Sequence, residues 1–81
     1  MDNKTAIIDR KVWNLIENAS EQACAEYGVN EKEVWSDKRF EYLQEFADGL
    51  IQDVLGWGRS YESVRFSAIN YVRAVIMQFA A

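Results

Sequence analysis

Histidine and proline are absent from this 81-residue sequence, and cysteine occurs only once, at Cys24. Without histidine, the chain lacks the side chain that most often exchanges protons near neutral pH and most often binds metal ions. A single cysteine forms neither an internal disulfide nor a zinc site of several thiolates. Because these absences remove most enzyme chemistries, we expect a non-enzymatic protein with no metal and no other cofactor.

The chain also lacks long apolar runs and an excess of positive charge. Thirteen Asp and Glu residues against nine Lys and Arg residues give a net charge of −4. A negative field disfavours direct binding of nucleic acid and of an anionic membrane surface. No apolar run is long enough to span a membrane or to serve as a signal peptide. With the unpaired Cys24, which suits a reducing compartment, these features predict a soluble cytoplasmic protein.

Apolar residues recur at helical spacing along the whole chain, which predicts an all-α fold. Only four glycines interrupt this pattern, and three of them stand where the periodicity breaks. We expect one domain spanning residues 1–81, a compact bundle of three long helices with a short helical turn near residues 31–35. A chain of this length buries only about 60–65% of its unfolded surface, so association with a second copy would add stability.

Local capping signals indicate where each helix begins and ends. Asp9 and Gly28 are expected to bound the first helix, Asn30 to cap the short turn and Ser60 to cap the last helix. The second long helix is expected to run from about residue 37 to about residue 55, and the last from residue 61 to near residue 79. The short turn either bends at Ser36 into the second long helix or runs together with it.

One apolar stripe on each long helix is the expected core. Small residues, Ala19 and Ala23, lie at the centre of the first stripe and allow another helix to approach closely. The predicted core residues are Val12, Ile16, Ala19, Ala23 and Tyr27 on the first helix, Phe40, Leu43, Ala47, Leu50, Ile51 and Val54 on the second, and Tyr61, Val64, Ala68, Tyr71, Val72, Val75 and Phe79 on the last.

Four acidic residues form the clearest surface feature. Asp37, Glu41, Glu45 and Asp48 project onto a strip only about 80° wide at helical pitch, with no core residue between them. Like charges four residues apart destabilise a helix by roughly 0.2–0.5 kcal/mol per pair. The strip is either an ordinary solvated face of an acidic protein or a docking site for a basic partner, because carboxylates at this spacing pair with Arg and Lys.

Trp57 lies between two glycines just after the second long helix. We expect its indole to fold back over that helix, since an apolar contact often accompanies a glycine helix stop. An exposed Trp57 would instead be a natural anchor for a binding partner. Cys24, at the edge of the first stripe with no basic neighbour in the sequence, is expected to be a packed thiol rather than a nucleophile.

The last helix reverses the charge of the chain and is apolar on more than one side. Arg59, Arg65 and Arg73 stand against a single acid in this segment. Arginines in such a helix suit phosphate contacts to DNA, but pairing with acids of this chain or of a second copy is the simpler interpretation. Phe66 and Met77 fall with Arg73 away from the core stripe, and these three residues are the candidate dimer interface.

Gly49 lies inside the second long helix, where glycine is less favourable than alanine by roughly 0.5–1 kcal/mol. It projects away from the core stripe. Two interpretations stay open, a tolerated imperfection or a position at which another helix approaches closely.

The leading hypothesis is a non-enzymatic interaction protein, such as a small inhibitor or adaptor, that docks on a basic protein surface, including one that binds nucleic acid. The candidate partner-binding residues are Asp37, Glu41, Glu45, Asp48 and Trp57. The alternative is a DNA-binding or transcriptional accessory protein that uses the arginine-bearing C-terminal helix. In either case we expect a homodimer formed through the last helix.

Overall fold

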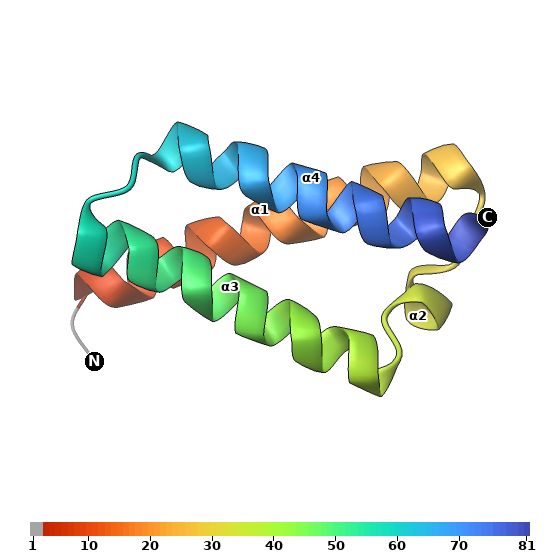
Figure 1. Cartoon of the computed structure of the whole chain (residues 1–81), viewed down its shortest axis with the longest axis horizontal. Coiled ribbons are helices and arrows are strands. Elements are labelled where there is room, and N and C mark those ends of the chain that lie inside the picture. Colours follow the sequence, from red (N-terminus) through yellow and green to blue (C-terminus); the bar gives the residue numbers. More distant parts are fainter. Residues whose placement is uncertain (1–2) are drawn as a thin grey trace.

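A computed structural model describes residues 3–81 of the chain. They form four helices in the order α1 (Asn3–Tyr27), α2 (Glu31–Val34), α3 (Asp37–Trp57) and α4 (Tyr61–Ala80), with no strand in this range. Figure 1 shows three long helices gathered into one bundle, with the single turn of α2 at one end. The predicted all-α fold of three long helices and a short turn is confirmed. None of these helices is long and apolar enough to cross a membrane.

The first helix begins earlier than its capping signal predicts. α1 already includes Asn3, so the expected start at Asp9 is wrong, and Asp9 lies exposed inside the helix. Residues 4–8 contain no glycine or proline to interrupt a helix, and Ile8 packs against the core. The added turns therefore gain helical hydrogen bonds and apolar contact that a start at Asp9 would lose.

Two glycines end α1 and α3 in the left-handed backbone conformation that favours glycine. Gly28 has φ 67° and Gly58 has φ 68°. After α1, the amide of Val29 closes the turn by donating to the carbonyl of Cys24 at 3.0 Å. After α3, the amide of Arg59 does the same by donating to the carbonyl of Asp53 at 3.1 Å. α3 continues to Trp57, two residues beyond its expected end.

Side-chain caps hold the starts of α2 and α4, as the sequence predicts. The Asn30 side chain accepts a hydrogen bond from the amide of Lys32 at 2.8 Å, and the Ser60 hydroxyl accepts one from the amide of Ser63 at 3.2 Å. At Ser36 the chain leaves α2 and turns into α3, although the Ser36 side chain makes no capping bond. Of the two alternatives for this segment, the bend at Ser36 is therefore the correct one.

The core draws residues from all four helices; α1 and α4 pack on each other most extensively, while α3 packs mainly on α1. The predicted stripes are largely confirmed, but Tyr27, Phe40 and Tyr61 are exposed. These three residues lie in the first or last turn of their helices, where neighbouring helices cover them incompletely. The buried apolar residues are Val12, Ile16, Ala19, Ala23 and Cys24 of α1, Val34 of α2, Leu43, Ala47, Leu50 and Ile51 of α3, and Val64, Ala68, Val72 and Ile76 of α4.

One buried polar side chain, Ser20, ties α1 to the α2 segment. The indole nitrogen of Trp35 donates a hydrogen bond to the Ser20 hydroxyl at 2.7 Å. That hydroxyl in turn donates to a carboxylate oxygen of Glu31 at 3.3 Å. Because Ser20 is buried, these bonds satisfy a hydroxyl that would otherwise destabilise the fold, and they fix the position of Trp35.

We predict that Ser20→Ala lowers the free energy of unfolding by about 1–3 kcal/mol, because the indole N–H of Trp35 loses its acceptor in a part-buried setting. Urea denaturation followed by circular dichroism measures this loss. In the Trp35→Phe background, which has no indole N–H, the same Ser20 change should cost much less. Equal losses in both backgrounds would contradict the role given to this hydrogen bond.

Candidate protein-binding surface

The four predicted strip residues all lie on the exposed side of α3. Asp37, Glu41, Glu45 and Asp48 recur at spacings of four and three, and each is solvent-exposed. The buried residues of α3, among them Ala47, face the opposite side of the helix toward the core. We call these four residues the acidic strip. α3 thus presents a continuous row of carboxylates to solvent.

No cation among residues 3–81 forms an ion pair with the acidic strip. The two ion pairs among residues 3–81 join Arg59 to Asp53 and Arg73 to Glu26, each at 3.0 Å. Neither pair uses a strip carboxylate, and none of the four strip side chains makes a hydrogen bond within this range. The repulsion between the strip charges is therefore left in place on the surface.

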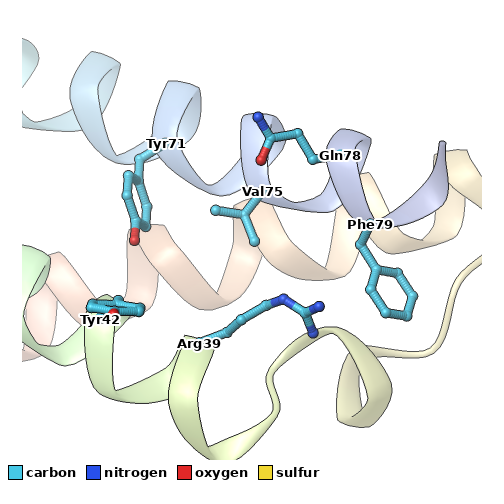
Figure 2. Close-up of a pocket in the computed structure, with 6 residues that line it drawn as sticks. All are labelled: Arg39, Tyr42, Tyr71, Val75, Gln78 and Phe79. Carbon is cyan, nitrogen blue, oxygen red and sulfur yellow. The ribbon is translucent and has the colours of Figure 1, made fainter.

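A groove runs beside the strip, where α3 and α4 diverge. Figure 2 shows Arg39 and Tyr42 of α3 facing Tyr71 and Phe79 of α4 across a hollow of about 250 Å³. The Arg39 guanidinium lies over the Phe79 ring at 5.1 Å and donates to the carbonyl of Val34 at 3.0 Å. We call this space the α3–α4 groove; its polar and aromatic lining was not predicted from the sequence.

The groove continues past a pair of stacked rings toward the loop between α3 and α4. Phe46 and Tyr71 stack with ring centroids 4.1 Å apart, and a second hollow of about 260 Å³ lies beside Gly49 and Asp53. Burial raises the pKa of the Tyr71 hydroxyl, and the negative charge of Glu45 raises it further. Glu45 therefore acts on the groove as well as belonging to the acidic strip.

Gly49 lines this groove, and the packing of the chain does not require a glycine at this position. A Cβ atom added at Gly49 would meet no atom within 4 Å. Internal close packing thus does not explain a glycine in the middle of α3. The sequence left two interpretations open, a tolerated imperfection or close approach by another helix. The space around Gly49 is compatible with close approach by a partner.

Trp57 does not fold back over α3, so the expected position of its indole is wrong. The side chain is 85% exposed, and α3 extends through residue 57, so the indole projects from the last residue of the helix. At about 100° per residue, Trp57 lies roughly 160° around α3 from the middle of the acidic strip. The structure therefore gives an exposed Trp57 but does not bring it onto the same face as the strip.

The arginines near α4 are largely engaged within the chain. Arg59 pairs with Asp53 and also donates to the hydroxyls of Ser63, at 2.9 Å, and Ser67. Arg73 pairs with Glu26 of α1. The intramolecular pairing expected for these arginines is present, with acids outside the strip as partners.

The outer side of α4 carries two exposed apolar side chains. Phe66 is 69% exposed and Met77 is 52% exposed. Arg73, the third residue of the predicted dimer interface, is turned toward α1 by its ion pair with Glu26. An apolar surface free for association is therefore present at Phe66 and Met77.

Cys24 is a packed thiol, as the sequence predicts. It is buried in the core, and burial raises the pKa of its thiol, with the charge of Glu31 adding to the rise and a hydrogen bond to Ser20 opposing it. A raised pKa keeps the sulfur protonated, and therefore weakly nucleophilic, at neutral pH. Within residues 3–81, no three Cys, Asp or Glu side chains lie together in a way that would hold a metal ion.

Comparison with protein-family models, with curated proteins and with solved structures gives no match to this chain.

We predict that Glu41→Gln raises the free energy of unfolding by roughly 0.4–1 kcal/mol at low ionic strength, because Glu41 repels both Asp37 and Glu45 one turn away and each pair costs roughly 0.2–0.5 kcal/mol. Thermal denaturation at low and high salt measures the effect. The gain should shrink in high salt, which screens exposed charges. If Glu41→Gln instead lowers the free energy of unfolding, the Glu41 carboxylate makes a stabilising contact and the prediction is wrong.

Proposed function

We propose that this chain is a non-enzymatic interaction module, of the inhibitor or adaptor kind, that docks on a basic surface of another protein through the acidic strip. Surfaces that bind nucleic acid have the required chemistry, since they present Lys and Arg side chains to phosphates. The proposal also locates the protein in the cytoplasm, where an unpaired cysteine is stable.

The observation that carries this proposal is the row of four exposed carboxylates with no cation partner among residues 3–81. Carboxylates held on a rigid helix form charge-assisted hydrogen bonds with Arg and Lys without first breaking an internal ion pair. Long-range attraction toward a basic partner also raises the association rate. Trp57, which is exposed but lies on another side of α3, supplies an apolar contact for a partner that reaches around the end of the helix.

The alternative, binding of DNA through the arginines near α4, has less support. Two of the three arginines, Arg59 and Arg73, are paired with acids of the same chain. Their release would cost those ion pairs before any phosphate was bound. Arg65 remains exposed, but one arginine gives little phosphate attraction to a chain of net charge −4.

The acidic strip is tested by replacing its carboxylates with amides in one variant, Asp37→Asn, Glu41→Gln, Glu45→Gln and Asp48→Asn. Tagged wild-type protein is expected to retain a Lys- or Arg-rich protein from an extract of its own cells. The purified partner should bind the strip variant at least about tenfold more weakly, because several charge-assisted contacts are lost. Mass spectrometry identifies the partner, and calorimetry at two salt concentrations measures both affinities.

The matched control removes four exposed carboxylates elsewhere, by Asp9→Asn, Glu21→Gln, Glu33→Gln and Glu62→Gln. It has the same net charge as the strip variant, so it separates the acidic strip from the overall charge. The control should keep the partner at near wild-type affinity. Equal affinity of the strip variant and the wild type for every retained partner would refute the proposal.

We also propose that two copies associate through α4, with Phe66 and Met77 in the contact. Their exposure on one side of α4 supports this arrangement, since burying apolar surface stabilises small domains. Light scattering should give twice the 9.4 kDa chain mass at micromolar concentrations. Phe66→Glu should return the mass to that of a single chain, whereas Trp57→Glu, at another exposed aromatic residue, should not. A monomeric wild-type protein would rule the dimer out.

A further inference from the structure

A further surface hollow lies where α1, the α2 segment and the start of α3 meet, on a different side of α3 from the α3–α4 groove. It has a volume of about 190 Å³ and is lined by three aromatic side chains, Trp13, Trp35 and Phe40. Two carboxylates, Glu17 and Glu31, also line it. We call this site the aromatic hollow.

The rings of the aromatic hollow are held in place by contacts within the chain. The indole N–H of Trp35 donates to the buried Ser20 hydroxyl at 2.7 Å, which fixes the orientation of that ring. Trp13 and Phe40 contact each other with centroids 6.0 Å apart and planes tilted by 38°. A ligand would therefore meet rings that are already positioned, and ordering them would cost little on binding.

The charges around the aromatic hollow are all negative. Glu17 is exposed, and Glu31 uses one carboxylate oxygen to accept from Ser20 at 3.3 Å. No Lys or Arg lines the aromatic hollow among the residues that the structure describes. Elsewhere in the same range the chain supplies cations to its own rings, Lys11 over Tyr61 and Arg39 over Phe79. The three rings of the aromatic hollow are thus left without a cation from the residues that line it.

We propose that the aromatic hollow binds an organic cation, an alkylammonium or guanidinium group. Aromatic side chains attract such cations through the negative faces of their rings, and guanidinium and alkylated ammonium groups lose hydration more readily than small inorganic ions. Glu17 and Glu31 supply the compensating negative charge. An uncharged apolar ligand would gain contact with the rings but nothing from the carboxylates.

The lysine and arginine side chains of a basic partner carry these groups, and in that form the inference rests on the proposed function. The preference of the aromatic hollow for a cation does not depend on the proposed function. Small probes therefore test the aromatic hollow even if the acidic strip binds no partner. They also distinguish a side chain from a free quaternary ammonium compound.

The test is a titration of the full-length protein with tetramethylammonium, N-acetyl-lysine methylamide and N-acetyl-arginine methylamide, followed by NMR of the three indole N–H signals. At least one probe should shift the signals of Trp13 and Trp35 in a saturable way. Trp57 is an internal reference, because it lies at the far end of α3, about 25 Å along the helix from Phe40. The probe that binds most tightly identifies the source of the cation.

Two pairs of variants assign the binding to these residues. Glu17→Gln should weaken binding about two- to fivefold, while Glu21→Gln, an equally exposed glutamate one turn further along α1, should not. Phe40→Leu should weaken it by a similar factor, while Tyr42→Leu, at an exposed aromatic on another side of α3, should not. Thermal denaturation confirms that each variant is folded.

Three outcomes would overturn the inference. The first is the absence of a saturable shift at Trp13 and Trp35 with any of the three probes. The second is equal binding of tert-butanol, a neutral compound of similar shape to tetramethylammonium, which would show an apolar hollow without preference for charge. The third is an equal loss in Glu17→Gln and Glu21→Gln, which would show general electrostatic attraction rather than a site.

Discussion

Close packing of α1 on α4 is the contact on which the rest of the structure depends. Small residues, Ala19 and Ala23 of α1 and Ala68 of α4, are buried, and Val64, Val72 and Ile76 of α4 are fully buried beside them. α3 packs on α1 far more than on α4, which it meets through the Phe46–Tyr71 stack and the contact of Arg39 with the Phe79 ring. Because α1 and α4 pair so closely, α3 is placed to one side, and the α3–α4 groove and the acidic strip result from that placement (Figure 1).

A single polar contact then connects the core to the surface. Ser20 is the one buried polar residue among residues 3–81, and it holds both Trp35 and Glu31. These two residues also line the aromatic hollow. The same hydrogen bonds that satisfy a buried hydroxyl therefore position a ring and a carboxylate at the surface, so the stability of this corner and the geometry of the aromatic hollow are not independent.

The sequence predicts those features that short-range chemistry decides. The caps at Asn30 and Ser60, the glycine stop at Gly28 and the helical periodicity depend on residues a few positions apart, and each prediction is confirmed. The start of α1 and the exposure of Trp57 depend on which helices cover a given turn, which no local pattern contains. The strip was visible because all its residues lie on one helix. The aromatic hollow draws residues from three segments, and periodicity gives no indication of such a site.

The acidic strip has no ion pair among residues 3–81, and one nearby cation is used elsewhere. Arg39, two residues after Asp37, turns away to the carbonyl of Val34 and the ring of Phe79. The strip and the aromatic hollow then act over different distances. Exposed carboxylates attract a basic partner over roughly a Debye length, about 8 Å at physiological salt, which affects mainly the rate of encounter. Rings and fixed carboxylates act only on contact, and Phe40 lies about 60° around α3 from Asp37. On the two proposals, a partner drawn in by the strip would bring its cations next to the aromatic hollow.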